Sequence, residues 1–449
     1  MKVHFIGIGG IGVSALAHYY LAKGAQVSGS DLVYSEILDS LKKEGAEIFI
    51  GKHSERNLRR DTDLVIYSPA VKSDNPEIKK AKKLKIQIQS YPQALGELTR
   101  QYFTIAVCGT HGKSTTTAMI ALILVKSGLD PTVIIGTKLN EFGRSNFRAG
   151  KSKYLVIEAD EHFASFLNYS PKIIVLTNIE ADHLDYYKNL SNYIDAFRKF
   201  INSLPDDGFL VINRDDKNSQ KIFNMNEKKK TSKKIDIEFY SFKDKEVEKL
   251  REILQVPGRH NIYNALAALK AARILGISDK QSFDTLSRYR GSWRRFEIKE
   301  GEINNKNFIL ISDYGHHPTE IKSTLEGARE KFSSKKIILI FQPHQYQRTY
   351  YLFNNFVDVF RKGARDFLFD KAIIIDIYDV VGREDKKIKE EINAEKLVKK
   401  INSRRVIYLP KEEIKDWLIN KLKGGEVVIL MGAGDIYDLE SDFSLDIYN

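Results

Sequence analysis

The residue types best suited to chemistry gather in a glycine-rich loop, Gly109–Thr117. The loop follows a strand pattern and precedes a helix that we expect from about Thr115. In such a loop, backbone N–H groups can point at phosphate oxygens, Lys113 can reach the β- and γ-phosphates, and the Ser114 hydroxyl is placed for Mg²⁺. Val107 stands where the generic phosphate loop has its first glycine, so only the Gly-Lys-Ser half of that pattern is met. The loop predicts a nucleotide site, with a plain glycine–lysine turn as the alternative.

Two acidic segments follow separate strand patterns further along the chain. Glu158–Glu161 comes after Tyr154–Ile157, and Thr177–Asp185, which contains His183, comes after Ile173–Leu176. The carboxyl ends of parallel strands share one edge of a sheet, where α/β proteins form their sites. Carboxylate oxygens suit Mg²⁺, and a histidine can join them where a second ion is held. Three polar loops at the ends of separate strands therefore predict magnesium-dependent chemistry, although each alone would more often be a solvated loop.

A second glycine pattern lies near the start of the sequence. Gly7–Gly12 satisfies G-x-G-x-x-G after a strand pattern, and Asp31 follows where a dinucleotide enzyme has its ribose-binding acid. Taken alone, this pattern predicts a nicotinamide cofactor. The glycines, however, only let the backbone approach a diphosphate beside a helix N-terminus, and a UDP-sugar gains from that as much as a dinucleotide does. A tight turn without a ligand is the third possibility.

The composition narrows the class of protein. Of 449 residues, 42% are hydrophobic and 29% charged, which is typical of a soluble globular protein with two to four domains. The single cysteine, Cys108, excludes an intramolecular disulfide, and no apolar run suits a transmembrane helix or a signal peptide. We therefore expect a cytoplasmic protein without membrane insertion. The formal charge of +12 fits polyanionic small substrates, and no zinc-finger, RNA-recognition or basic heptad pattern predicts nucleic-acid binding.

Short β-branched runs separated by helix-length segments predict buried parallel strands in α/β layers. They fall into three blocks, with boundaries expected near residues 98–104 and 291–293. An alanine-rich stretch from Asn261 to Leu275 predicts a buried helix that ends near Gly276. The strand patterns are Val3–Gly7, Leu64–Tyr67, Ile86–Ile88, Thr104–Cys108, Tyr154–Ile157, Ile173–Leu176, Phe308–Ile311, Lys336–Ile340, Ala372–Ile375 and Val427–Leu430.

These motifs together resemble the Mur ligase family over essentially the whole chain. The phosphate loop, the Glu-Ala-Asp-Glu segment and the Thr-Asn-Ile-Glu-x-Asp-His segment occur in the family's order and spacing. Gly7–Gly12, Asp182–Asp185 and Tyr314–Pro318 look most like the members that add L-alanine, with the peptide-recycling members as the nearest competitors. Further matching segments are Val256–Asn264, Arg294–Glu297, Asp313–Glu320, Phe341–His344 and Gly432–Asp435.

The resemblance implies a three-domain α/β enzyme. A Rossmann-like UDP-binding domain is expected at 1–99, a central P-loop ATPase domain at 100–292 and a Rossmann-like, amino-acid-binding domain at 293–449. The implied activity is an ATP- and Mg²⁺-dependent ligation of L-alanine to UDP-N-acetylmuramate in peptidoglycan precursor synthesis, by a monomer or a homodimer. ATP would phosphorylate the lactyl carboxylate, because a carboxylate lacks a good leaving group, and the amine of alanine would then displace phosphate.

The resemblance also implies roles for individual residues. Lys113, Glu158 and His183 are the expected catalytic residues, with Ser114 and Glu158 on one Mg²⁺ and His183 and Glu158 on a second. The expected ATP-binding residues are Gly109, Thr110, His111, Gly112, Lys113, Ser114, Thr115, Asn261, Asn264, Arg295 and Asp313. The expected UDP-sugar-binding residues are Gly9, Gly10, Ile11, Gly12, Asp31 and Ser68. The expected amino-acid-binding residues are Tyr314, His316, His344, Gln345 and Arg348.

The sequence departs from the family's pattern at the expected amino-acid site. The family has an arginine after the Pro-His pair, where it can bind the substrate carboxylate through two hydrogen bonds, and this chain has Gln345. An amide can still donate hydrogen bonds but loses the charge-assisted contact. The family's Asp-Asp-Tyr is Ser312-Asp313-Tyr314 here, a smaller change because Asp313 is kept.

Two other classes of protein remain open from the residues alone. A nicotinamide oxidoreductase would explain Gly7–Gly12 and Asp31, but it leaves Gly109–Thr117 and His183 without a role. A non-catalytic protein that binds nucleotides or polyanions would explain the positive charge, but not the three polar clusters.

Overall fold

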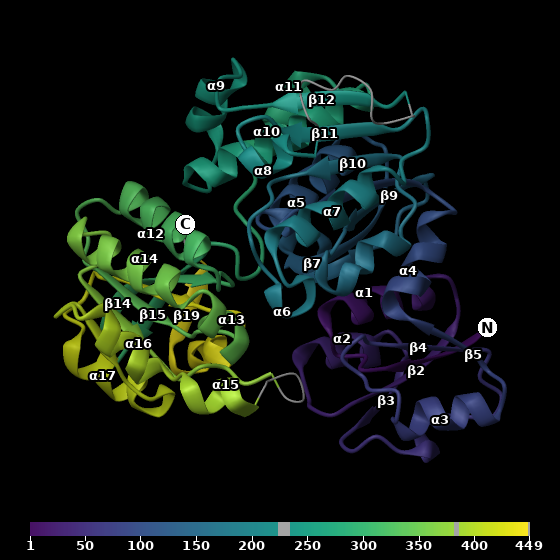
Figure 1. Ribbon diagram of the computed structural model, residues 1–449, viewed down its shortest axis with the longest axis horizontal. Helices are drawn as coiled ribbons and strands as arrows, with labels where there is room; N and C mark the ends of the chain where they lie inside the picture. The colour runs from purple at the N-terminus through teal and green to yellow at the C-terminus, as the bar shows by residue number, and fades with distance from the viewer. Residues whose placement is uncertain (223–233, 381–385, 448–449) are drawn as a thin grey trace. The chain divides into compact units, whose positions relative to one another are not determined.

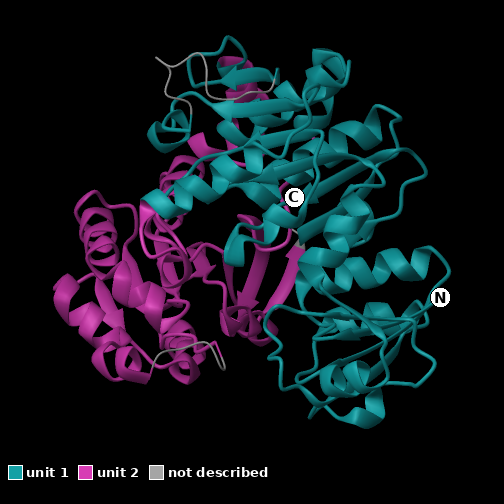
Figure 2. Cartoon of the chain, turned by 45° about the vertical axis from the view of Figure 1, so that its right-hand side comes forward, with its two compact units in different colours: residues 1–180, 191–247, 263–286 teal, residues 181–190, 248–262, 287–449 magenta. Residues whose placement is uncertain are grey.

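A computed structural model describes residues 1–222, 234–380 and 386–447 (Figure 1). The chain forms two compact units (Figure 2): unit 1 comprises residues 1–180, 191–247 and 263–286, and unit 2 comprises residues 181–190, 248–262 and 287–449. The first two predicted blocks fall mainly in unit 1 and the third in unit 2. This division does not test the predicted domain boundaries at 99/100 and 292/293, which stay predictions.

Unit 1 begins with a five-stranded parallel sheet of order β3-β2-β1-β4-β5. Phe5, Ile6, Val65 and Ile66 are fully buried, as expected for strands of a parallel sheet with both faces covered. Its strands are β1 (Lys2–Ile6), β2 (Gln26–Asp31), β3 (Glu47–Ile50), β4 (Leu64–Tyr67) and β5 (Gln87–Ser90). Its helices are α1 (Ile11–Ala22), α2 (Glu36–Lys43), η1 (Glu55–Asn57), α3 (Pro76–Lys83) and α4 (Tyr91–Thr99).

A second sheet of unit 1 has seven strands in the order β12-β11-β10-β6-β9-β7-β8. All pairs are parallel except β7–β8, which forms an antiparallel edge. The strands are β6 (Phe103–Cys108), β7 (Thr132–Leu139), β8 (Ser145–Arg148), β9 (Tyr154–Glu158), β10 (Ile173–Leu176), β11 (Phe209–Asn213) and β12 (Asp236–Tyr240). Because β10, β6 and β9 are neighbours, the three polar loops follow adjacent strands of one sheet, which confirms that prediction.

The helices around this second sheet include both predicted ones, with shifted starts. Helix α5 begins at Lys113, two residues before the prediction, because Gly112 adopts φ +81° and turns the chain directly into the helix. Helix α10 (Arg259–Ile274) begins two residues early and ends before Gly276, whose φ of +74° is left-handed. The helices of this part of the chain that belong to unit 1 are α5 (Lys113–Lys126), η2 (Asn140–Phe142), η3 (His162–Asn168), α7 (Leu190–Ile201), α8 (Lys217–Gln220) and α11 (Asp279–Leu286). Helix α6 (Leu184–Tyr187) and most of α9 (Glu246–Ile253) belong to unit 2, and α10 is divided between the two units.

The sheet of unit 2 has the order β17-β16-β15-β18-β14-β13-β19. Strand β13 is antiparallel to both neighbours, so the prediction of parallel strands fails at this edge. The reason is a two-residue hairpin, Asn304-Asn305, whose φ values of +49° and +61° suit a tight β-turn. The strands are β13 (Glu297–Ile303), β14 (Lys306–Asp313), β15 (Ile337–Phe341), β16 (Lys371–Ile374), β17 (Val406–Tyr408), β18 (Val427–Met431) and β19 (Ser444–Ile447).

Helices and two hydrophobic clusters complete unit 2. The clusters divide the buried residues of the sheet by alternation: Leu339 and Ile429 belong to one, and Ile338 and Val428 to the other. The helices are α12 (Pro318–Lys331), α13 (Tyr346–Tyr351), α14 (Phe353–Arg365), α15 (Lys386–Glu391), α16 (Ala394–Ile401), η4 (Lys411–Glu413), α17 (Ile414–Lys421) and η5 (Asp435–Asp442). Within the described ranges of both units, no helix is long and apolar enough to span a membrane.

Candidate active site

The phosphate loop of unit 1 is built around two glycines that no other residue could replace without strain. Gly109 and Gly112 have φ values of +132° and +81°. A Cβ on Gly109 would lie 2.1 Å from Thr177 Oγ1, and one on Gly112 would lie 2.3 Å from Asn264 Oδ1. The loop between β6 and α5 therefore needs glycine both for its conformation and for the close approach of its neighbours.

The segment after β10 holds this loop in place. The Thr110 amide donates to the Asn178 carbonyl at 2.9 Å, and the His111 amide donates to Asn178 Oδ1 at 3.0 Å. The Thr177 hydroxyl donates to the His111 carbonyl at 2.7 Å, and His111 Nε2 lies 2.9 Å from the Glu180 carboxylate. Residues 177–180, the first part of the predicted Thr177–Asp185 cluster, thus support the phosphate loop, and the predicted metal role of that cluster stays a prediction.

Lys113 is the first residue of α5 and points back into the loop. Its Nζ donates to the Gly109 carbonyl at 2.7 Å and to the Thr110 carbonyl at 3.1 Å, and it forms an ion pair with Glu161 at 2.9 Å. Burial lowers the pKa of Lys113, but the Glu161 carboxylate outweighs this effect and the net shift is upward. Lys113 is therefore a fully charged ammonium group beside the loop that would hold the phosphates.

Three further predicted ATP-site residues lie around the same loop. Ser114 and Thr115 are in the first turn of α5 and nearly buried, and Asn264 of α10 accepts a hydrogen bond from Thr116 at 3.2 Å. Glu158 ends β9, where it is paired in register with Val107 of β6, and its Oε2 accepts a hydrogen bond from the Gly136 amide at 3.0 Å. The Ser114 hydroxyl, in the first turn of α5, and the Glu158 carboxylate, at the end of β9, are hard oxygen donors of the kind that suits Mg²⁺.

The N-terminal glycine loop connects β1 to α1. The Gly9 amide donates to Asp31 Oδ2 at 2.8 Å, so this acid lies against the loop, and its predicted contact with a UDP-sugar stays a prediction. Gly10 is the N-cap of α1, and the carbonyl of Ile11 accepts a hydrogen bond from the Asn146 side chain of β8. The other two predicted residues are also close: a Cβ on Gly7 would lie 2.9 Å from Ser68, and one on Gly12 would lie 2.9 Å from Tyr91.

A cavity of about 660 Å³ lies within unit 1 near this loop. Its walls include Tyr67, the last residue of β4, Val71 just after that strand, and Phe163 of η3. Val71 is also a neighbour of Gly7, because a Cβ built on that glycine would lie 3.5 Å from its side chain. The cavity therefore extends from the side of the glycine loop to the segment just after Glu158–Glu161.

In unit 2, four of the five predicted amino-acid-binding residues form a chain of ring and guanidinium contacts. The Tyr314 and His316 rings lie 5.6 Å apart, His316 and His344 lie 5.8 Å apart, and Arg348 Nη1 is 3.3 Å from His344 Nδ1. Burial lowers the pKa of His316 to about 4 and also lowers that of His344, so both rings are neutral near pH 7. The structure thus brings these four residues together, and their role in binding an amino acid stays a prediction.

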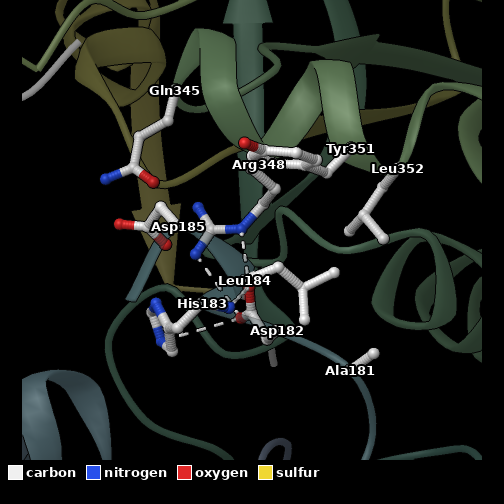
Figure 3. A pocket seen from close by; sticks show the side chains of 9 residues that line it. All are labelled: Ala181, Asp182, His183, Leu184, Asp185, Gln345, Arg348, Tyr351 and Leu352. Carbon is white, nitrogen blue, oxygen red and sulfur yellow. Dashed lines mark hydrogen bonds and ion pairs between the residues drawn. The ribbon is translucent and has the colours of Figure 1, made fainter. Parts of the chain in front are cut away.

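Arg348 forms an ion pair that the sequence did not predict (Figure 3). Its Nε lies 3.1 Å from Asp182 Oδ1 and its Nη2 lies 3.4 Å from Oδ2. Gln345 and Asp185 line the same pocket, together with His183. Gln345 has the unusual combination φ +71°, ψ 131° at the N-cap of α13, a strained conformation for a non-glycine residue. Arg348 is thus already paired, and Gln345 is the neutral polar side chain next to it.

Asp313 and Arg295, two residues of unit 2 that we expected to contact the nucleotide, make contacts within that unit. The Asp313 carboxylate accepts hydrogen bonds from the amides of Phe296 at 2.9 Å and Gly315 at 2.7 Å. Burial raises the pKa of Asp313 to about 6. The Arg295 guanidinium lies over the Tyr314 ring, 4.8 Å from its centre. Asp313 therefore shapes the backbone around Tyr314, and any contact with ATP stays a prediction.

Some predicted pairings involve both units, and these stay predictions. Glu158 belongs to unit 1 and His183 to unit 2, where the His183 amide donates to Asp182 Oδ1 at 2.8 Å. Asn261, Arg295 and Asp313 also belong to unit 2, while the phosphate loop belongs to unit 1. Asn261 Nδ2 donates to the Pro257 carbonyl at 2.7 Å, a local contact within the segment before α10.

Sequence reasoning missed three residues of these sites: Glu161, Asp182 and Tyr193. Glu161 and Asp182 stand inside the quoted acidic motifs, so a search for the counter-ions of Lys113 and Arg348 could have selected them. Tyr193, whose hydroxyl donates to Glu161 Oε1 at 3.0 Å, lies on α7 with no local signal.

Three family models match successive parts of the chain. Residues 2–103 match the Mur ligase family catalytic domain, residues 107–272 the Mur ligase middle domain, and residues 294–434 the Mur ligase glutamate ligase domain. The chain therefore belongs to the Mur ligase family.

Within that family, similarity is high to L-alanine-adding proteins. A UDP-N-acetylmuramate–L-alanine ligase of Acetivibrio thermocellus is 44% identical over 99% of this chain and 96% of its own length. The crystal structure of the UDP-N-acetylmuramate–alanine ligase of Thermotoga maritima matches with a TM-score of 0.77 at 29% identity, over 98% of both chains. A murein peptide ligase of Psychrobacter arcticus has a TM-score of 0.71 at 24% identity, over 98% of this chain and 97% of its own, and shares the fold alone.

Proposed function

We propose that this protein joins L-alanine to UDP-N-acetylmuramate with hydrolysis of ATP, through an acyl-phosphate intermediate. The observation that carries the proposal is the phosphate loop, in which Lys113 and Ser114 meet the carboxyl ends of β6, β9 and β10 beside Glu158. The near full-length similarity to L-alanine ligases supports the choice of substrates.

The proposed reaction has two steps. The lactyl carboxylate of the UDP-sugar attacks the γ-phosphorus of ATP, and the bond to ADP breaks. The unprotonated amine of L-alanine then attacks the acyl carbon, the bond to phosphate breaks, and the nitrogen loses its extra proton. The charged Lys113 would stabilise negative charge on the transferring phosphate, which in phosphoryl transfer is the main task of the protein. Mg²⁺ on Ser114 and Glu158 would neutralise phosphate charge in the same step.

The substrates are assigned to regions of the chain by chemistry. The glycine loop of Gly9–Gly12 would bind the UDP diphosphate at the N-terminus of α1, and the neighbouring cavity of about 660 Å³ has room for the sugar. The region of Tyr314, His344 and Arg348 would receive L-alanine. Burial lowers the pKa of His316 and His344, so these two rings add no positive charge beside the incoming amine, and the Arg348 guanidinium is already paired with Asp182. We place the reaction in the cytoplasm, the compartment that supplies ATP.

The test is phosphate release from ATP in the presence of UDP-N-acetylmuramate and each of several amine substrates. We expect the highest kcat/KM with L-alanine, and neither glycine, L-serine nor a peptide beginning with L-alanine should exceed it. Lys113→Ala should abolish turnover but keep UDP-sugar binding, since the glycine loop lies on a separate sheet. Faster use of the peptide than of L-alanine would instead assign the chain to peptide recycling, and saturable NAD binding without UDP binding would favour an oxidoreductase.

A further inference from the structure

We infer that Glu161 is a positioning residue that competes with bound phosphate for Lys113. This inference rests on the proposed function, because it takes the Gly109–Thr117 loop as the site of the ATP phosphates. It adds a residue outside the predicted catalytic set, and it concerns how strongly the loop holds a nucleotide.

The hydrogen bonds of Lys113 require an exchange of partners. An ammonium group has three N–H donors, and here Nζ contacts the Gly109 carbonyl, the Thr110 carbonyl and the Glu161 carboxylate, the last at 3.0 Å from Oε1 and 2.9 Å from Oε2. Lys113 can therefore donate to a β- or γ-phosphate only by giving up one acceptor. Of the three acceptors, only Glu161 can carry a negative charge; burial raises the pKa of its carboxyl to about 7, and the Lys113 ammonium opposes this shift. Replacing the Glu161 carboxylate by phosphate therefore exchanges one charge-assisted hydrogen bond for another.

The surroundings of Glu161 keep its carboxylate in place after such an exchange. Its side chain is 1% exposed, and its Oε1 accepts a hydrogen bond from the hydroxyl of Tyr193, which is fully buried. The same hydroxyl lies 3.2 Å from Thr110 Oγ1, inside the phosphate loop. A displaced Glu161 therefore stays beside the loop as an alternative partner for Lys113. This competition for Lys113 weakens nucleotide binding and so favours the release of ADP.

The experiment measures nucleotide affinities by calorimetry for the wild type and Glu161→Gln, a substitution of equal shape. The neutral amide keeps a hydrogen bond to Lys113 but removes the charge-assisted part, so we expect ATP and ADP to bind about tenfold more tightly. AMP is the matched ligand control, because it lacks the β- and γ-phosphates that Lys113 reaches, and its affinity should not change. A merely structural role predicts the opposite sign, since damage to the loop would weaken all three nucleotides.

Three further variants make the test specific. Asp160→Asn removes the same charge from the neighbouring residue, for which the described part of the chain gives no bond to Lys113, and should have a much smaller effect. Tyr193→Phe removes one hydrogen bond from Glu161 but keeps the ion pair, so any tightening should be smaller than that of Glu161→Gln. In a Lys113→Ala background, Glu161→Gln should no longer tighten ADP binding.

The outcomes separate this inference from the function on which it rests. Wild-type protein that binds no ATP would remove the proposed function itself. Normal ATP binding that Glu161→Gln leaves unchanged or weakens would overturn only the inference. Tightening that persists without Lys113 would also overturn it, because the effect would then be direct repulsion between the carboxylate and the phosphates.

Discussion

Replacing Asp182 by Asn should destabilise unit 2 more than any surface charge change there. The Arg348 and Asp182 side chains are 6% and 9% exposed, and their closest atoms, Nε and Oδ1, are 3.1 Å apart. Removing one partner of a buried pair costs roughly 3–5 kcal/mol, because the other charge is left without compensation. Since Asn can still accept one hydrogen bond from the guanidinium, we expect the lower end, about 3 kcal/mol in the free energy of unfolding.

The chain carries a built-in reporter for this measurement. Its two tryptophans, Trp293 and Trp417, both belong to unit 2, so urea unfolding followed by tryptophan fluorescence reports on the unit that contains the pair. Asp366→Asn is the matched control, because it breaks another Arg–Asp pair of unit 2, with Arg365, whose side chains are 71% and 49% exposed. That variant should unfold at the wild-type urea concentration, since exposed pairs are screened by water.

The pH dependence gives a second check on the same pair. Burial raises the pKa of Asp182, but the Arg348 guanidinium outweighs this effect and holds the pKa well below its ordinary value of 3.8. The unfolded carboxyl therefore takes up its proton at a higher pH than the folded one. The extra stability of the wild type over Asp182→Asn should be complete above about pH 5 and should shrink as the pH falls below 3.8 toward the folded pKa. A difference under about 1 kcal/mol at pH 7, or one that does not shrink in acid, would refute the buried-pair reasoning.

Three further outcomes are expected. Gln345→Arg should lower the KM for L-alanine by roughly one to two orders of magnitude without changing ATP affinity, because the guanidinium adds a charge-assisted contact to the substrate carboxylate. An unchanged KM for L-alanine, glycine and L-serine would place Gln345 away from the substrate. Gly112→Ala should abolish ATP binding by calorimetry, since its Cβ would lie 2.3 Å from Asn264 Oδ1, while Gly128→Ala, with a similar φ of +79° but open space around it, should retain binding. Glu77→Gln should speed amide hydrogen exchange in β1 and β2 at pH 7, because the Glu77 carboxylate accepts hydrogen bonds from side chains of both strands. Burial raises the pKa of Glu77, but the surrounding hydrogen bonds outweigh this effect and lower the pKa to about 2, so the difference from wild type should be complete above pH 4.5 and vanish as the pH approaches 2. Equal exchange of the two proteins at pH 7 would contradict this prediction.

Much of the candidate site could be predicted from the sequence because its parts are local. A glycine-rich segment between a strand and a helix predicts a phosphate loop, and the structure has such a loop between β6 and α5, with Gly109 and Gly112 in left-handed conformations and Lys113 at the start of the helix. The carboxyl ends of parallel strands share an edge, so the polar segments at Glu158 and Thr177 could be assigned to one region before any contact was known.

Other features could not be predicted from strand patterns or from the composition of a segment. The antiparallel edge at β13 arises from a hairpin turn at Asn304-Asn305, which a run of β-branched residues does not reveal. The Thr-Asn-Ile-Glu segment supports the phosphate loop through side-chain and backbone hydrogen bonds, a role that its composition did not indicate. Composition reports which atoms a segment offers, but not which neighbour will use them.

The sequence by itself thus determined the family, the three sheets and the place of the phosphate loop, since these depend on periodicity and on short motifs. Only the tertiary structure decided the partners of the buried charges. Arg348 is paired with Asp182, 166 positions away in the chain, and Lys113 with Glu161, 48 positions away. Burying an unpaired charge is costly, so each of these cations must have a counter-ion, but several carboxylates in the same motifs could have served. Which one does is set by the packing of strands and helices, and that packing determines whether a substrate meets a free cation or one that is already paired.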